Sequence, residues 1–178
     1  MAFSINELSQ GLKFGGARPT LFDVQITFPQ NQVETVFNIQ TAQLPESTLG
    51  VIEVPYFGRK IKLAGDRTFA EWTVTVLNDE DFAIRNSLEV WSQQINTHAG
   101  NTYEYGLAPS AYRQRAVIRQ YSKDGRDNPL RTYVFENLFP TSVGPIQMGW
   151  DQNDQIETFD VTFQYDYWVA SGSGSAIT

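Results

Sequence analysis

The chain has 178 residues, which fits a single domain that can bury a core without disulfides or metal ions. Its net charge of −7 argues against ordinary nucleic-acid binding, because phosphates repel an acidic surface. The absence of cysteine excludes disulfides and thiolate chemistry, and the sequence shows neither a signal peptide nor an apolar run of membrane-spanning length, so a soluble protein is expected.

The N-terminal part of the sequence predicts an arm followed by two strands. Residues 1–20 are mixed and contain several glycines, which indicates an N-terminal arm. Residues 21–28 alternate between apolar and polar side chains, as a half-buried strand does. Residues 33–42 form the next candidate strand, and the short turn between the two favours a hairpin.

Residues 44–64 have a different pattern, because prolines and glycines interrupt two short extended pieces at 51–56 and 59–63. This segment is too polar for a core, and we expect a protruding hairpin in which Pro55 occupies an edge position. Strict alternation returns at residues 71–77, where a further half-buried strand is predicted.

One helix is predicted after this strand. Asn78 or Asp79 is expected to cap it, with acidic residues in its first turn, and Gly100 is expected to end it. The evidence is an apolar stripe at helical spacing, formed by Ile84, Leu88, Trp91 and Ile95.

The C-terminal part again predicts strands. Residues 115–121 and 130–139 read as partners across a turn, and residues 156–169 give the longest alternating strand. Residues 171–178 read as a flexible tail. We therefore expect a single mainly β domain over residues 1–170 with one packed α-helix. The apolar face predicted for the longest strand is Phe159, Val161, Phe163, Tyr165 and Tyr167.

No group of residues predicts catalysis, a metal site or a cofactor. His98 is the only histidine, and a serine-hydrolase elbow is absent. The acidic run 79–81 lacks the spacing of a calcium loop, and Asp151 and Asp154 fit a tight turn. Six basic residues predict either a nucleic-acid patch or ion pairs with an identical neighbour: Arg113, Arg115, Arg119, Lys123, Arg126 and Arg131.

Several segments resemble the tail tube proteins of contractile-tailed bacteriophages. The most specific is the run Ala64-Gly65-Asp66-Arg67-Thr68-Phe69, which precedes the Trp-Thr-Val-Thr-Val strand at residues 72–76. Residues 17–22, 117–121, 139–144 and 160–168 also resemble the family. The similar segments occur in order from about residue 17 to residue 168, so the resemblance covers nearly the whole chain.

The resemblance implies two packed antiparallel sheets in a barrel-like tail tube fold, with a helix alongside. It also implies hexameric rings stacked helically around a channel that conducts viral DNA without binding it specifically. The implied partners are the tail sheath protein, the tape measure protein and baseplate tube-initiator proteins. The implied location is the virion tail, assembled in the cytoplasm of the host bacterium.

The resemblance and the patterning together give two sets of candidate surface residues. The 44–64 arm is the candidate for contact between rings, and the polar faces of two strands are candidates for the channel wall. The arm set is Val54, Pro55, Tyr56, Phe57, Gly58, Arg59, Lys60 and Arg67. The channel set is Asn38, Gln40, Asp160, Gln164 and Asp166.

Four other interpretations compete with a phage tail tube. The nearest is the inner tube of a tailocin, an extracellular contractile injection system or a type VI secretion apparatus, which carries no genome. A lectin-like β-sandwich would use Tyr103, Tyr105 and Tyr112 for binding. A glycosidase would need two carboxylates that meet only in the fold. A tube-initiator subunit from the same family is also compatible with the sequence.

Overall fold

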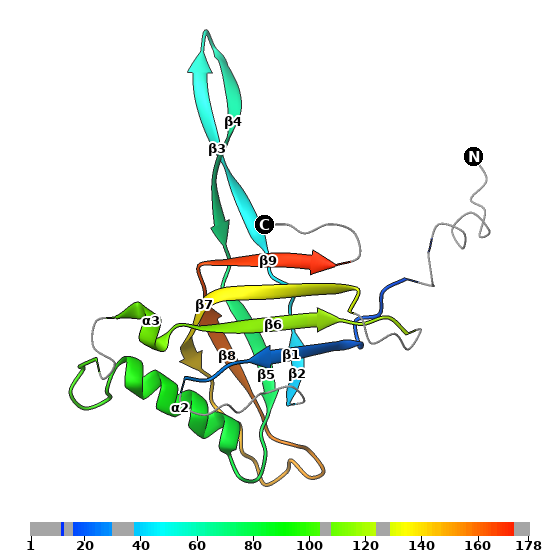
Figure 1. Ribbon diagram of the computed structural model, residues 1–178, viewed down its shortest axis with the longest axis vertical. Helices are drawn as coiled ribbons and strands as arrows, with labels where there is room; N and C mark the ends of the chain where they lie inside the picture. Colours follow the sequence, from blue (N-terminus) through cyan, green and yellow to red (C-terminus); the bar gives the residue numbers. More distant parts are fainter. Residues whose placement is uncertain (1–11, 13–15, 30–37, 104–107, 124–128, 173–178) are drawn as a thin grey trace.

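The computed structural model describes residue 12 and residues 16–29, 38–103, 108–123 and 129–172. Over these ranges the chain is built mainly from antiparallel strands with one long helix, which confirms the predicted class. A two-stranded arm extends far from the body (Figure 1). Most of the predicted N-terminal arm, residues 33–37 of the second predicted strand and residues 173–178 of the predicted tail lie outside the described residues.

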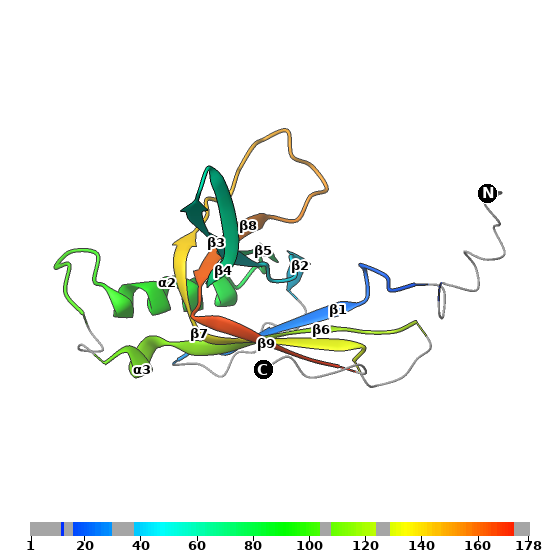
Figure 2. The same cartoon turned by 90° about the horizontal axis from the view of Figure 1, so that it is seen from above.

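The body consists of two antiparallel sheets that share one strand (Figure 2). We call them the first sheet and the second sheet. The first sheet has the order β1 (Phe22–Ile26), β6 (Gln114–Gln120), β7 (Arg131–Val143) and β9 (Tyr167–Gly172). The second sheet has the order β7, β8 (Thr158–Gln164), β5 (Trp72–Leu77) and β2 (Ile39–Ala42).

Strand β7 passes from one sheet to the other. Its first part pairs with β6 and β9, and its last residues, 139–143, pair with β8. Asn137 lies at the transition with a φ of 60°, a left-handed conformation that asparagine tolerates better than most residues. Thr141 is then an extra residue in the register with β8, and such a bulge bends the strand further.

The predicted strand 156–169 is divided by the same transition. It forms β8 in the second sheet and β9 in the first, with Tyr165 and Asp166 between them. The apolar alternation continues through Tyr165, which is buried, but Tyr167 is exposed. The prediction of one continuous strand was wrong, because alternation reports which face is buried and carries no signal for a change of sheet.

Apolar side chains from both sheets and the helix fill the space between the layers. Trp72 of β5 stacks on Phe135 of β7 with 4.4 Å between ring centroids, so the two sheets meet through aromatic contact. Each fully buried side chain of this size contributes about 1.5–3 kcal/mol. The largest fully buried side chains are Trp72, Trp91, Phe135, Phe163, Leu88, Ile118, Leu138, Val24, Val74, Val76 and Val161.

The predicted hairpin between the first two strands is not formed by the described residues. β1 pairs with β6, and β2 pairs with β5 at the opposite end of the strand order. The predicted hairpin of β6 and β7 is confirmed. Local patterning identifies strands, but the partner of an edge strand is decided by which apolar faces can share a core.

The helix α2 spans Ala83–Ile95 and buries the predicted stripe, with Ile95 partly exposed. Its predicted ends were wrong. Phe82, with a φ of 54°, precedes the first turn, and Asp81 Oδ1 accepts a hydrogen bond from Ala83 N at 3.1 Å. The helix ends at Asn96 rather than Gly100, because Asn96 adopts an extended conformation. A single short turn of helix, α3 (Pro109–Tyr112), leads into β6.

Candidate functional site: the assembly surfaces

The arm consists of β3 (Ser47–Tyr56) and β4 (Arg59–Phe69), which pair only with each other among the described strands. The predicted protruding hairpin is therefore confirmed, with strands longer than expected. Phe57 and Gly58 form its turn with φ values of 45° and 79°. Positive φ at both positions is the type I′ requirement, which glycine meets without strain and phenylalanine does not.

The two faces of the arm differ in chemistry. In the outer half, cross-strand pairs alternate between an apolar face and a charged face. The apolar face carries Ile52, Val54, Tyr56, Ile61 and Leu63, all exposed to solvent, and Arg59 lies on the same face opposite Tyr56. On the charged face, Lys60 Nζ lies 2.6 Å from Glu53 Oε2. Among the described strands β3 and β4 pair only with each other, and an isolated two-stranded ribbon is marginally stable on its own.

The pairing of the two arm strands is irregular near Gly50 and Gly65. Gly50 and Gly65 face each other there, and a Cβ added to Gly65 would lie 3.1 Å from the Gly50 carbonyl group. The register also shifts between Leu49 and Val51. Close backbone approach at this point requires glycine, and the shift in register marks a β-bulge there. Arg67, nearer the body, donates a hydrogen bond to Ser47 Oγ at 3.1 Å.

The opposite end of the molecule carries a loop and a turn that we call the acidic end, residues 144–157 and 78–82. Each segment contains three carboxylates and no lysine or arginine. The two are held together because Asn78 donates to the carbonyl and to the side chain of Glu157, at 2.8 and 3.0 Å. The turn predicted at Asp151–Asp154 is present in the loop, and Asp154 has a φ of 59°.

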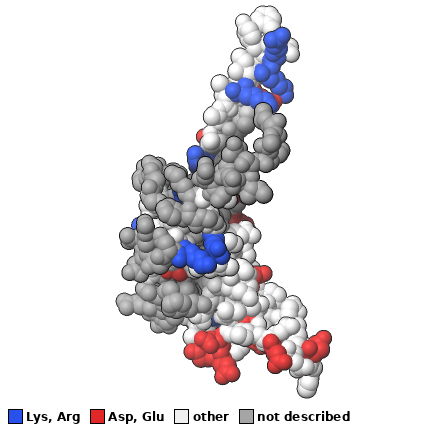
Figure 3. Space-filling model, turned by 90° about the vertical axis from the view of Figure 1, so that its right-hand side faces the viewer, with Lys and Arg blue, Asp and Glu red and all other residues white. Residues whose placement is uncertain are grey.

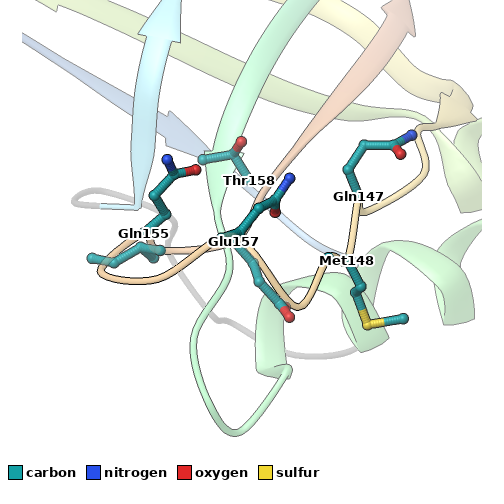
Figure 4. A pocket seen from close by; sticks show the side chains of 8 residues that line it. Gln147, Met148, Gln155, Glu157 and Thr158 are labelled. Atoms are coloured by element: carbon teal, nitrogen blue, oxygen red, sulfur yellow. The ribbon is translucent and has the colours of Figure 1, made fainter.

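The loop of the acidic end also exposes large apolar side chains. Trp150 is 102% exposed and Met148 is 84% exposed, and Ile156 is also open to solvent. Beside them is a hollow of about 400 Å³, far larger than the roughly 30 Å³ that one water occupies in the liquid. Figure 4 shows Gln147 and Met148 on one limb of the loop and Gln155, Glu157 and Thr158 on the other.

Charge is therefore distributed unevenly along the molecule. Figure 3 shows basic side chains near the end of the arm and acidic side chains gathered at the opposite end. Arg59 and Lys62 of the arm make no ion pair with another described residue. The two ends differ in sign and both expose apolar side chains, which gives them complementary chemistry.

The outer face of the second sheet is polar and contains no cation. Strands β2, β5 and β8 include no lysine or arginine. Asp160 accepts a hydrogen bond from Thr75 at 2.7 Å, and Gln164 donates to Glu71 at 3.0 Å. Thr41 donates to Thr75 at 2.8 Å, which continues the hydroxyl-rich face onto β2. The structure thus brings together Asp160 and Gln164, two of the residues proposed for a channel wall.

The other three channel candidates lie around this face. Gln40 is the extra residue in the register of β2 with β5 and is exposed. Asn38, just before β2, is 3.5 Å from Asp79 Oδ2. Asp166 lies in the turn between β8 and β9, where Arg113 and Asn137 donate to its carboxylate at 3.1 and 2.8 Å.

Two edges of the second sheet are open among the described residues. β2 has β5 on one side only, and residues 139–143 of β7 have β8 on one side only. Open edges present unpaired N–H and C=O groups and favour pairing with another chain. The second sheet ends with strands of opposite direction, since every pairing within it is antiparallel.

The basic residues singled out in the sequence are largely paired within the chain. Arg113 pairs with Asp166, Arg115 with Glu136, and Arg119 with Asp23. The hydrogen bond to Glu136 raises the pKa of Arg115 above its usual value. The guanidinium carbon of Arg131 lies 5.4 Å from the centroid of Tyr133. Three of the six basic residues therefore have a carboxylate partner within the chain, and Arg126 lies outside the described residues.

The remaining polar candidates do not assemble into a chemical site in the described part of the chain. His98 is exposed in the turn after α2, and no three metal-ligating side chains gather among the described residues. Tyr103 is exposed, whereas Tyr112 packs edge-on against Phe139; Tyr105 lies outside the described residues. None of the described helices has the length and apolar character needed to cross a bilayer.

Comparison with known proteins identifies the family. The sequence profile of the family described as phage tail tube protein matches residues 17–171. The chain belongs to the phage tail tube protein family. It is 37% identical to the tail tube protein gp19 of Enterobacteria phage T4 over 165 residues, which cover 92% of this chain and 98% of that protein. It is 28% identical to the tail tube protein of Serratia phage KSP90, covering 91% and 94% of the two chains.

The tail tube fold also extends to contractile injection systems. A chain in the sheath–tube complex of an extracellular contractile injection system, PVC, superposes with a TM-score of 0.67. The superposition covers 96% of this tail tube protein and 99% of that chain, at 16% sequence identity. The two packed sheets and the helix are therefore a fold shared between phage tails and these particles.

The loop of the acidic end was missed in the sequence. Met148 and Trp150 follow no period of two or 3.6, so patterning assigned them to the approach to the next strand, and Ile156 was wrongly included in that strand, which begins at Thr158. The available signal was compositional: a tryptophan and a methionine stand among glycine, glutamine, asparagine and aspartate, which is unusual for a solvated loop.

Proposed function

We propose that this tail tube protein forms hexameric rings that stack helically into a tube, and that the tube conducts DNA during ejection inside a contractile sheath. The protein acts in this proposal as a structural subunit of the virion tail and not as an enzyme. The observation that carries the proposal is the pair of open edges on the second sheet, at β2 and at residues 139–143 of β7.

Ring closure would join these two edges. If β2 of one copy pairs with residues 139–143 of the next, the second sheets of all copies become one barrel without an edge. The second sheet contributes an even number of alternating strands, so the joint between copies is antiparallel as well. An aggregation-prone edge is thereby converted into the bond that builds the ring.

The outer face of the second sheet would line the channel. It offers hydroxyl, amide and carboxylate groups, with Asp160 and Gln164 at its centre and Asn38 and Gln40 near its edge. Because no cation lies on its β2, β5 and β8 strands, DNA phosphates would find no partner that releases counterions on binding. A polar, anionic wall would let DNA pass without being held. Asp166 would contribute less, since Arg113 and Asn137 bind its carboxylate.

The arm would connect one ring to the next. Its tip residues Val54–Lys60 extend away from the body, and Arg67 lies nearer its base (Figure 1). Helical stacking needs two different surfaces that mate head to tail, and the two ends of this molecule differ in both shape and charge.

Further partners follow from a tube inside a contractile tail. The sheath protein would surround the tube, and the tape measure protein would occupy the channel before DNA does. Baseplate tube-initiator proteins would provide the first ring. Assembly would take place in the cytoplasm of the host bacterium.

A second candidate is the inner tube of a tailocin, an extracellular contractile injection system or a type VI secretion apparatus. The similarity to a chain of the PVC sheath–tube complex favours it, because that fold match covers 96% of this chain. The two candidates differ in whether the native particle contains a genome.

Electron microscopy of the purified full-length chain tests the proposal. We expect rings with six-fold symmetry, and stacks of rings at higher concentration. Charge-detection mass measurement of the rings should give six copies. A protein that remains a monomer at every concentration, with no ring in micrographs, would refute the proposal.

The channel assignment has its own test in a virion. Asp160→Lys with Gln164→Lys should leave tubes intact and slow DNA ejection, because the new cations would bind passing phosphates. Gln93→Lys on the exposed side of α2 is the matched control and should leave the ejection rate unchanged. Wild-type ejection kinetics in the double variant would show that another face lines the channel.

A further inference from the structure

On the basis of the stacked rings proposed above, we infer that the arm of one copy docks on the acidic end of a second copy in the adjacent ring. The apolar face of the arm would cover Trp150 and Met148, and the basic residues at its tip would face the carboxylates of residues 78–82 and 144–157. The contact is thus assigned to the arm of one copy and the acidic end of another copy.

The first argument is the exposure of large apolar side chains at both ends. Phe57 is 90% exposed at the tip of the arm, and Trp150 is 102% exposed in the loop of the acidic end. Aromatic side chains left open in this way are typical of interfaces, where they supply much of the binding free energy. The hollow beside Met148 is roomy enough to receive an aromatic ring from the arm.

The second argument is charge. Within the outer half of the arm, Arg59, Lys60 and Lys62 outnumber the single acidic residue Glu53. The acidic end offers six carboxylates and no lysine or arginine within its two segments. Opposite charges steer the correct ends together, and two like ends would repel each other.

The third argument is geometry. The arm and the acidic end lie at opposite ends of the long axis (Figures 1 and 3). A contact between them is heterologous, so it repeats from copy to copy and builds a column instead of a closed dimer. This is the type of contact that stacking of rings requires.

The fourth argument is the missing support beneath the arm. Residues 51–64 are all exposed, including Val54 at 42% and Ile61 at 53%, so no described element covers the apolar face of the ribbon. The acidic end of another copy exposes apolar and acidic side chains. It would cover the apolar face of the ribbon and supply carboxylates for its basic residues.

Cross-linking tests the contact directly, because the chain contains no cysteine and introduced thiols are the only ones present. A chain with Tyr56→Cys and Gln152→Cys is assembled into tubes and treated with a short bis-maleimide. Each copy would be linked through its arm to one neighbour and through its acidic end to another. We therefore expect a ladder of covalent multimers on a denaturing gel. The control pairs Tyr56→Cys with Gln93→Cys, an exposed position about three helical turns along α2 from the acidic end, and should give no ladder.

Charge reversal provides a second readout. Glu80→Lys with Asp151→Lys should reduce the mass of sedimented tubes at least tenfold while rings persist, because the arm would then meet like charge. Adding Arg59→Glu to the same chain should recover a measurable part of the tubes. Raising the salt concentration should weaken stacking of the wild-type protein. It should have less effect on the Glu80→Lys, Asp151→Lys variant, which has lost these attractions.

The outcomes separate this inference from the proposed function. If wild-type protein forms stacked tubes but the Tyr56–Gln152 cysteine pair gives no ladder, or the reversed charges leave tube mass unchanged, the docking surface is wrong and the tube stands. If wild-type protein forms neither rings nor tubes, the proposed function fails, and the docking inference fails with it.

Discussion

Replacing Phe57 with asparagine should separate the folding of the arm from its docking. Phe57 and Gly58 occupy the two central positions of a turn with positive φ at both. Asn-Gly is the favoured sequence for such a turn, and a non-glycine aromatic residue with positive φ is strained. The Phe57→Asn variant therefore improves the local backbone while it removes the most exposed aromatic side chain of the arm.

The effect on the stability of the subunit is small. Relief of the left-handed strain contributes about 1 kcal/mol. Phe57 loses an edge-on contact with Tyr56, whose ring centroid lies 4.6 Å away, and such a contact contributes about 0.5–1.5 kcal/mol. Because Phe57 is 90% exposed, no cavity is created. These contributions nearly cancel, and we expect the free energy of unfolding to change by less than about 1 kcal/mol.

The effect on stacking is larger. Burial of a phenylalanine side chain at a contact contributes about 1.5–3 kcal/mol. Each contact between rings would lose this amount, which corresponds to roughly a 10- to 150-fold weaker contact. The critical concentration for tube growth should rise by at least ten-fold, because several copies of the contact act together in one ring.

Sedimentation of tubes against total protein measures the critical concentration, and urea unfolding of dilute subunits measures stability. Tyr103→Asn, which removes an exposed aromatic residue from the loop after α2, is the control. Unchanged tube growth in Phe57→Asn would refute the reasoning. Loss of tubes together with a large loss of subunit stability would also contradict it, because the substitution is expected to relieve backbone strain in the turn.

Two further predictions concern the core. Trp91→Phe should lower the free energy of unfolding by about 2–4 kcal/mol, because the indole N–H donates to the Tyr112 carbonyl at 2.8 Å and the smaller ring leaves a cavity; urea titration of dilute subunits measures this, and a loss below about 1 kcal/mol would contradict it. Burial raises the pKa of Tyr165, so the unfolded chain releases this proton first and stability falls as the pH rises above about 10. Tyr165→Phe should reduce that alkaline loss and should not lower stability near pH 7, since the buried hydroxyl has no hydrogen-bond partner among the described residues; urea titrations at the two pH values compare the variants, and an unchanged alkaline slope would refute the assignment.

Strand positions were the part of the fold that the sequence predicted well. The alternation at residues 21–28 and 71–77 encodes which side chains face the core, and β1 and β5 lie within those segments. The partner of each strand was harder to predict from the sequence. β1 and β2 are neighbours in the sequence but lie at opposite ends of the strand order, because β1 pairs with β6 and β2 pairs with β5.

The ends of the helix show a different limit. Asp79, Glu80 and Asp81 look like a capped first turn, but the backbone reverses through Phe82 before the helix begins. The apolar stripe located the helix correctly because burial decides it. Residue types that cap helices also favour ordinary turns, and the sequence alone does not distinguish a helix cap from a turn.

Some of the candidate surfaces could be predicted from the sequence and others could not. The arm and the polar face at Asp160 and Gln164 were accessible, because proline and glycine punctuation and strict alternation leave clear marks in a sequence. Trp150 and its loop were not, since nothing periodic signals that an aperiodic segment will leave a tryptophan open to solvent. The change of sheet after Tyr165 gave no signal in the sequence, and it places the carboxylate of Asp166 beside Arg113.

The shared strand β7 has a mechanical consequence. Its 13 residues run without a break through both layers, so the layers are joined by covalent backbone as well as by packing. Two separate sheets held only by apolar contact can slide across each other, whereas here sliding would require bending one strand at Asn137 and breaking its ladder on both sides. In the proposed tube, this continuous strand would keep the two layers of each subunit from sliding across each other when the tube is loaded along its axis.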